Sequence, residues 1–164
     1  NIMSIDNDWF DFALFSRLRT LDLSCNKIVI IKKSYFQDNR RLSFLNFSHN
    51  NILFIENGSL NFFYFLDLSF NFLKQFTKSQ LLQEASTIFL TNNQLNYTDY
   101  IFSTTHLSHN DLNEIPLVHE RFIKNQIVSF IDISYNRIKE IKLNTFPKSH
   151  TREILLRNNL IIHL

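Results

Sequence analysis

The chain has 164 residues and a net charge of +2, with basic residues scattered along its length. The two basic doublets, Lys32-Lys33 and Arg40-Arg41, form no stripe, so a nucleic-acid or membrane-surface role is not supported. No stretch reaches about 18 consecutive apolar residues, the length that a membrane-spanning helix needs, so any membrane attachment would come from regions outside this sequence.

The first predicted element is a short strand around Leu21 and Leu23, followed by Asn26 and Ile28. From Leu18 it reads L-x-x-L-x-L-x-x-N-x-I, and the pattern recurs six more times. The ninth place of every copy is an asparagine: Asn26, Asn50, Asn71, Asn93, Asn110, Asn136 and Asn159. The steps between these asparagines are 24, 21, 22, 17, 26 and 23 residues, and such a series in register predicts a repeat architecture.

Each copy predicts one strand with two inward apolar side chains, five and three residues before the asparagine, as at Leu66 and Leu68 before Asn71. The strands are expected to stack in parallel into one sheet on the concave side. An asparagine amide both donates and accepts hydrogen bonds, so the seven asparagines are expected to form a buried polar ladder that satisfies the backbone groups of the turns.

Apolar residues also recur two, five and ten places after the asparagines. The first and sixth repeats illustrate this with Ile28, Ile31 and Phe36, and with Ile138, Ile141 and Phe146. The agreement is typical of repeats of about 24 residues with a mostly irregular convex side. The predicted fold is an α/β solenoid shaped as a horseshoe, with about seven repeats and residues 1–164 as a single array.

One repeat is irregular, because only 17 residues separate Asn93 from Asn110 and Thr105 occupies an inward place. The following step is long, at 26 residues, and contains Ile115-Pro116. Either the convex side is cut to a tight loop here, or residues are missing from the deduced sequence. Sheet continuity or curvature is expected to be disturbed in this repeat.

Both ends of the sequence fall inside repeats. Ile2, Ile5 and Phe10 match the places two, five and ten residues after an asparagine that would precede residue 1. Leu164 matches the place five residues after the last asparagine. The chain is therefore expected to be a segment of a longer array, with any terminal caps outside it.

The sequence Leu-Asp-Leu-Ser-x-Asn at 21–26 and 66–71, with its apolar residues five and ten places later, resembles the leucine-rich repeats of animal extracellular proteins. It is most similar to the ectodomains of Toll-like receptors and chaoptin-type adhesion proteins. The resemblance implies an ectodomain that binds protein or microbial ligands in innate immunity or cell adhesion, and that often dimerises. The 17-residue repeat and the lack of cysteine-rich caps depart from the family pattern.

The solvent-facing places of each strand are expected six, four, two and one residues before the asparagine. Phe44, Phe65, Phe70 and Phe89 occupy such places, and with Asp67 they are the predicted ligand-binding surface. Exposed aromatic patches usually mark interaction sites. The alternative is lateral packing among neighbouring side chains in a chain that contains 18 phenylalanines.

Acidic and histidine residues share these places. Asp22, Asp67 and Asp132 do not lie in adjacent repeats, so they are expected to solvate the strands and not to bind calcium. His106 and His109 have no third ligand at metal spacing, so no metal site is expected. The sequence contains no catalytic or cofactor signature, and neither an enzyme nor a cofactor is expected.

Three asparagines, Asn46, Asn57 and Asn96, match the glycosylation acceptor pattern. Asn57 and Asn96 fall on the return side, where a glycan is tolerated and expected, whereas a glycan at Asn46 would cover the patch around Phe44. The single cysteine, Cys25, excludes an internal disulfide and a cysteine metal site, so cysteine usage does not fix the compartment.

These patterns predict a recognition module of a receptor or secreted protein, at an extracellular or cell-surface location, with a protein or microbial ligand as partner. Two alternatives stay open: a cytoplasmic leucine-rich-repeat scaffold, and a structural protein with homophilic contacts. A signal peptide and caps in the parent sequence would favour the receptor, and self-association would favour the homophilic protein.

Overall fold

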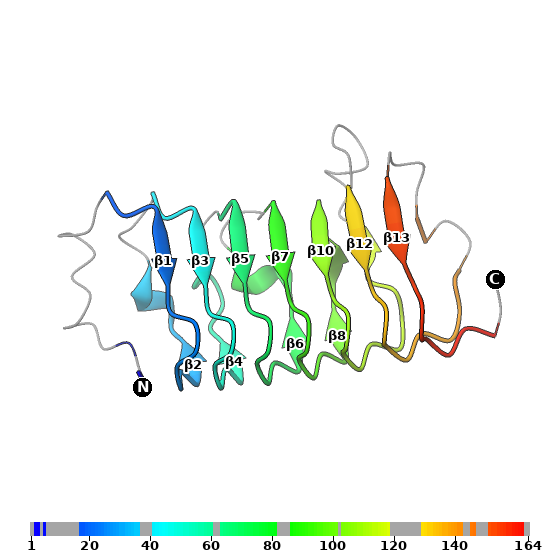
Figure 1. Cartoon of the computed structure of the whole chain (residues 1–164), viewed down its shortest axis with the longest axis horizontal. Helices are drawn as coiled ribbons and strands as arrows, with labels where there is room; N and C mark the ends of the chain where they lie inside the picture. Colours follow the sequence, from blue (N-terminus) through cyan, green and yellow to red (C-terminus); the bar gives the residue numbers. More distant parts are fainter. Residues whose placement is uncertain are drawn as a thin grey trace.

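The computed structural model describes residues 2–3, 5, 17–36, 41–60, 63–81, 86–101, 103–118, 129–142, 145–146 and 151–162. Its main element is a seven-stranded parallel sheet to which each repeat contributes one strand (Figure 1). In sheet order the strands are β1 (Thr20–Asp22), β3 (Phe44–Asn46), β5 (Phe65–Asp67), β7 (Thr87–Phe89), β10 (Thr104–His106), β12 (Phe130–Asp132) and β13 (Glu153–Leu155). The predicted solenoid with one parallel sheet is confirmed.

All neighbouring strands of this sheet pair in the same register. The residue six places before one asparagine pairs with its counterpart in the next repeat, as Phe44 does with Phe65. Side chains alternate along a strand, so the central residue points into the core while its neighbours face solvent. Leu45, Leu66 and Ile88 take the central place and are 0% exposed. We call the solvent-facing side of the seven strands the sheet face.

Shorter strands form three two-stranded parallel sheets outside the main sheet. These pairs are β2 (Ile30–Ile31) with β4 (Phe54–Ile55), β6 (Gln75–Phe76) with β8 (Tyr97–Thr98), and β9 (Tyr100–Ile101) with β11 (Leu117–Val118). We call the side of the array that carries β2, β4, β6 and β8 the lateral edge (Figure 1). Two 3-10 helices, η1 (Lys33–Tyr35) and η2 (Lys78–Gln80), cover part of the return side, and no α-helix occurs in the described parts of the chain.

The short repeat does not interrupt the main sheet, so the expected disturbance of sheet continuity is wrong. Strand β7 pairs with β10 in unbroken register, and Thr105 fills the inward place at 1% exposure. The irregularity lies in the return segment, where β9 and β11 form an additional pair seven and eight places after Asn93 and Asn110, beyond the usual places four and five residues after the asparagine. The repeat is shortened in its return segment and not in its strand, which explains why the sheet continues.

The core is a continuous apolar layer between the sheet and the return segments. In the first repeat Ile28, Ile31 and Phe36 are all 0% exposed. The ring of Phe36 packs edge-on against Phe47 and Phe63, with centroid distances of 6.0 and 6.4 Å. Burial of such side chains stabilises the fold by ~1.5–3 kcal/mol each. Part of the phenylalanine excess is therefore core.

The asparagines link each turn to the turn before it. Asn71 Oδ1 accepts the backbone N–H of Ile52 at 2.9 Å, and its Nδ2 donates to the carbonyls of Phe47 and Leu68, both at 3.0 Å. The same three bonds recur at Asn50, Asn93, Asn110, Asn136 and Asn159. One amide thus satisfies backbone groups of two neighbouring repeats that the sheet no longer pairs.

Candidate functional site

A left-handed residue precedes every asparagine of the ladder and turns the chain out of its strand. These residues have φ between 54° and 56°, and none is glycine: Cys25, His49, Phe70, Asn92, His109, Tyr135 and Asn158. For a residue with a Cβ this conformation is disfavoured by ~1–2 kcal/mol. Its recurrence in all seven turns shows that the bonds of the turn determine the local backbone, whatever the side chain.

The side chain four places before the asparagine caps the same turn. Asp67 Oδ1 accepts the N–H of Ser69 at 2.9 Å and its hydroxyl at 2.6 Å. Asn46 makes the equivalent bond to the N–H of Ser48, at 2.9 Å, with a neutral amide. The place two before the asparagine was expected to face solvent, but it is buried at Ser48, Ser69, Ser108 and Ser134, half-buried at Ser24 and Thr91, and exposed only at Arg157. At Ser69 and Ser134 both the backbone N–H and the hydroxyl bond the capping aspartate, which holds the serine against the turn.

Hydrogen bonding of this kind lowers the pKa of Asp22. The side chain and the backbone N–H of Ser24 make the largest contributions, with a smaller one from Asn46 and an opposing effect of burial. The bond from Ser24 N to Asp22 Oδ1 is 2.8 Å long. A charge-assisted bond of this length favours the ionised form, so the cap adds negative charge to the sheet face.

Five rings form a continuous row across the sheet face. This aromatic row consists of Phe44, Phe65, Phe89, His106 and Phe130, with centroid distances between successive members of 6.1, 5.1, 4.2 and 4.8 Å. Aromatic pairs at such distances add ~0.5–1.5 kcal/mol beyond area burial. The rings also remain accessible, since Phe44 is 41% exposed and the other members are half-buried. The sequence left two interpretations of these phenylalanines, an exposed binding patch and lateral packing between neighbouring side chains. In the structure the same rings do both.

The structure brings three of the predicted phenylalanines, Phe44, Phe65 and Phe89, into this row. Phe70 does not join it, because it stands in the left-handed place, where its ring stacks on His49 at 4.2 Å. Asp67 does lie beside the row, paired in register with Phe89 on the next strand.

Sequence reasoning missed two members of the row, His106 and Phe130. Their places supplied the signal, since His106 is equivalent to Phe89, and Phe130 to Phe65. An imidazole is as flat as a phenyl ring, and the interplanar angle between His106 and Phe89 is 9°. A histidine can therefore replace a phenylalanine in a row of stacked rings, which its residue type alone does not indicate.

Burial lowers the pKa of His106, whose ring is half-buried between Phe89 and Phe130. The charges of Asp132 and Asp67 oppose this effect and raise the pKa by smaller amounts. A lowered pKa keeps the imidazole neutral at neutral pH, so it acts there as an uncharged ring.

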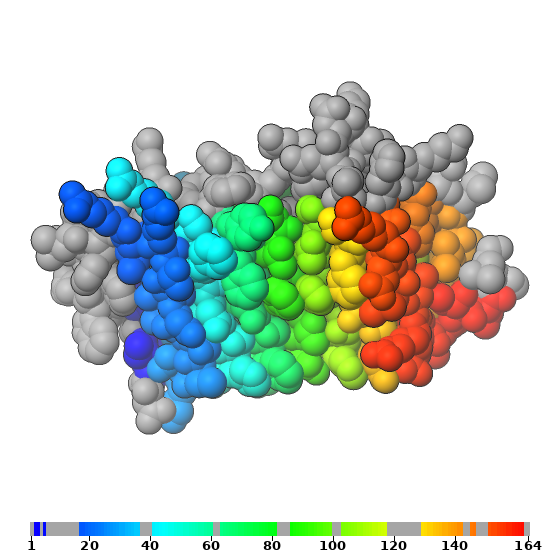
Figure 2. All heavy atoms as spheres, turned by 45° about the horizontal axis from the view of Figure 1, so that its top comes forward, coloured from blue at the N-terminus to red at the C-terminus, as the bar shows by residue number. Residues whose placement is uncertain are grey.

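Side chains in the left-handed places form a second set of stacked rings. His109 stacks on Tyr135 with a centroid distance of 4.1 Å, and the Arg157 guanidinium lies 5.6 Å above the same tyrosine ring. The bands of colour in Figure 2 show how side chains of successive repeats stand side by side along the array. Like-placed residues therefore stack even where the sequence varies.

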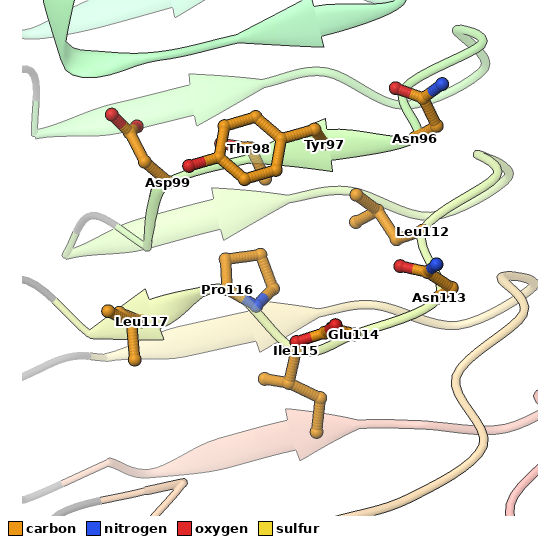
Figure 3. Close-up of a pocket in the computed structure, with 10 residues that line it drawn as sticks. All are labelled: Asn96, Tyr97, Thr98, Asp99, Leu112, Asn113, Glu114, Ile115, Pro116 and Leu117. Carbon is orange, nitrogen blue, oxygen red and sulfur yellow. The ribbon is translucent and has the colours of Figure 1, made fainter.

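A hollow of about 550 Å³ opens on the lateral edge beside the short repeat (Figure 3). It is lined by Asn96, Tyr97, Thr98, Asp99, Leu112, Asn113, Glu114, Ile115, Pro116 and Leu117. In the figure, Tyr97 and Asp99 lie on the β8 side and Pro116 on the facing segment. Proline has no N–H, so this segment is poorly suited to extend the β6–β8 pairing. The Asp99 carboxylate accepts the N–H of Lys78, at 3.0 and 3.1 Å.

The acceptor asparagines lie in three different settings. Asn57 is exposed in a turn beside Gly58, whose φ is 66°. Asn96 is exposed at the rim of the hollow. Asn46 is half-buried on the sheet face, where its side-chain oxygen caps a turn. Asn57 and Asn96 are thus both exposed, and their glycosylation stays a prediction.

The described parts of the chain contain no group of three or more His, Cys, Asp or Glu side chains that could hold a metal ion. No helix among those residues is both long and apolar enough to cross a membrane. Cys25 is a free, exposed thiol in the first left-handed place. The candidate site is therefore the sheet face, with the aromatic row at its centre.

Comparison with known proteins agrees with this architecture. The leucine rich repeat family model matches residues 16–73. The structure of the leucine-rich repeat domain of APL1B is similar, with 19% identity and a TM-score of 0.69, over 90% of this chain and 44% of that one. A chain of the LRIM1/APL1C complex is also similar, with 21% identity and a TM-score of 0.76, over 99% of this chain and 30% of that one.

At these identities the likeness concerns the fold, and the chain spans less than half the length of either similar protein. No protein of curated function matches the sequence. Residues 16–73 thus match the leucine rich repeat family, and the fold of the array is that of solved leucine-rich-repeat structures.

Proposed function

We propose that this leucine-rich-repeat array is a protein-recognition module that binds its partner on the sheet face, through the aromatic row. The observation that carries the proposal is the row itself, which crosses five neighbouring strands and remains accessible along its length. Aromatic side chains that are exposed together are enriched at binding hot spots. The protein then acts by binding, without catalysis or a cofactor.

The rings are held in place before any partner arrives. Each stands on a strand whose register is fixed by its neighbours and whose turn is closed by the asparagine ladder. Phe89 and His106 are further ordered by their stacking at 4.2 Å. Binding to side chains that are already ordered costs less conformational entropy, which favours affinity.

The proposal includes an extracellular or cell-surface location, as part of a receptor or secreted protein in innate immunity or cell adhesion. The exposed acceptor residues Asn57 and Asn96 and the resemblance to Toll-like receptor and chaoptin-type ectodomains support it. One similar structure is that of a complex, LRIM1/APL1C, which is in keeping with a protein partner. A microbial ligand, or pairing of the parent ectodomain, would use the same scaffold.

Substitution Phe65→Asp tests the binding face. It places a charge in the middle of the aromatic row, so binding of the natural partner, captured from the source tissue, should fall by at least about tenfold. The matched control is Phe54→Asp, because Phe54 is 49% exposed on the lateral edge. Both variants should keep the circular dichroism spectrum of the unaltered protein. Equal capture by both variants would show that the sheet face is not the site.

Glycopeptide mass spectrometry of the protein from its own cells tests the location. Occupied Asn57 or Asn96 would place the chain in the secretory pathway. If Asn46, Asn57 and Asn96 are all bare and Cys25 is reduced, the cytoplasmic scaffold becomes the better interpretation. Occupancy of Asn46 would move the binding face away from the aromatic row.

A further inference from the structure

Two carboxylates bracket the centre of the aromatic row. Across β5, β7, β10 and β12, the residues four places before the asparagines are Asp67, Phe89, His106 and Asp132, and the strand register puts them in one line. The parallel line on the same strands consists of Phe65, Thr87, Thr104 and Phe130. The sheet face therefore presents two stacked rings between two acids, with a further ring beside each acid.

Both acids keep an oxygen available for a partner. Asp132 Oδ1 accepts the N–H of Ser134 at 3.0 Å and its hydroxyl at 2.6 Å, the same bonds that Asp67 receives from Ser69. The second oxygen of each carboxylate has no hydrogen-bond partner among the described residues. The charges of both acids reach His106, which lies between them.

The sheet face is acidic although the chain carries a net charge of +2. The places six and four residues before the asparagines hold no lysine or arginine, and their charged residues are Asp22, Asp67, Asp132 and Glu153. Arg157, two places before Asn159, is an exposed cation beyond the end of the last strand, with its guanidinium over Tyr135. A second copy would bring acids against acids, which disfavours self-pairing through this face. Charge complementarity instead favours a basic partner.

We propose that the sheet face binds an extended basic segment of a partner protein, lying across the strands with two Lys or Arg side chains four residues apart. This rests on the proposed function, because it uses the same aromatic row. Asp67 and Asp132 are three strand spacings apart, about 14 Å at about 4.8 Å per spacing. Residues i and i+4 of an extended chain point to the same side and are about 13 Å apart, which matches.

The chemistry of the face suits such a segment. The cationic group at i meets the free oxygen of Asp67, and the group at i+4 meets that of Asp132. Their aliphatic stems, or a flat guanidinium, lie on the rings of Phe65 and Phe130, where a cation is attracted to the ring face. The side chain at i+2 falls on the Phe89–His106 pair and is apolar.

Fluorescence anisotropy with labelled peptides tests the spacing. The probe Ser-Lys-Ser-Leu-Ser-Lys-Ser should bind the purified protein. The rearranged peptide Ser-Lys-Lys-Ser-Leu-Ser-Ser, of the same composition, should bind about 5- to 10-fold more weakly, because it reaches only one acid. The analogue with Glu in place of both lysines should not bind.

The double substitution Asp67→Asn with Asp132→Asn tests the acids. An amide preserves the turn cap, as Asn46 shows in its own repeat, so the variant removes charge without removing the hydrogen bond to the turn. Binding of the spaced lysine peptide should fall about 5- to 10-fold. The matched control, Asp111→Asn with Glu114→Gln, removes two charges on the lateral edge, where Asp111 pairs with Arg137 at 2.7 Å, and should bind as the unaltered protein does.

Several outcomes would overturn the inference. If all three peptides bind equally and Phe65→Asp abolishes binding, the basic segment is wrong while the aromatic recognition face stands. If the control acids matter as much as Asp67 and Asp132, the attraction is general and not a feature of this site. If no peptide binds the folded protein, the basic segment is likewise rejected, and the partner-capture comparison still tests the proposed function.

Discussion

At the scale of single residues, the place a side chain occupies in the repeat decides its role more than its chemical type does. Phe47 is core, Phe65 belongs to the aromatic row, and Phe70 turns the chain in a left-handed conformation. Histidine behaves in the same way, since His106 stacks within the row and His109 stacks on the turn tyrosine. In each case the residue type alone, without its position in the repeat, would give the wrong role for the side chain.

His106 makes stability depend on pH. Burial lowers its pKa in the folded state, against the smaller opposing effects of Asp132 on β12 and Asp67 on β5, while β7 presents the uncharged Phe89. The unfolded chain therefore binds more protons between the lowered and the ordinary pKa, so stability is full above the ordinary value and falls as the pH drops through this window. Urea unfolding between about pH 7.5 and pH 5 should show this loss.

The variant His106→Asn should flatten that pH dependence, because the titrating group is gone. His109→Asn is the matched control, since His109 is exposed, and its pH dependence should remain that of the unaltered protein. Identical slopes for the unaltered protein and His106→Asn would show that acids elsewhere, and not the ring in the row, govern the effect.

At the scale of elements, the unit of this fold is a strand, its capped turn and the asparagine that joins it to its neighbour. The main sheet keeps one register through all seven strands, even across the 17-residue repeat. The 17-residue repeat is short in its return segment. There the β9–β11 pair forms farther from the asparagines than the other short pairs do, and the hollow beside Pro116 opens. The strand and turn are thus conserved in geometry while the return segment absorbs changes in length.

Each asparagine of the ladder should contribute most to the free energy of unfolding in the middle of the array. Asn71→Leu leaves the buried N–H of Ile52 unpaired and removes one of the two amide bonds to each of the carbonyls of Phe47 and Leu68, which Asn50 and Asn93 still reach. The free energy of unfolding should fall by about 2–3 kcal/mol. Asn26→Leu should cost about 1 kcal/mol, because Asn26 is half-buried and bonds no carbonyl of a preceding repeat. Chemical denaturation measures both, and equal losses would contradict a cooperative ladder.

At the scale of the whole molecule, different surfaces of the array carry different kinds of side chain. The sheet face carries the aromatic row and the acids, and the interior holds the phenylalanine core. The lateral edge carries exposed apolar side chains, such as Leu53 and Phe54, as well as the Glu114–Lys142 pair at 3.5 Å. A solenoid allows this because each row of equivalent places runs the length of the molecule and can vary independently of the others.

The sequence by itself determined the repeat, the strand positions and the asparagine ladder. The alternation of apolar and polar residues along a strand and the asparagine that recurs in each repeat are local patterns, and each corresponds directly to a local structure. It also indicated the places of Phe44, Phe65 and Phe89 on one face. The tertiary structure alone decided that the sheet continues through the short repeat, that Phe70 leaves the row, and that His106 and Phe130 complete it between two acids. Those features arise from contacts between side chains of neighbouring repeats. Such contacts depend on the strand register and on the local backbone conformation, which the pattern of residues along one repeat does not reveal.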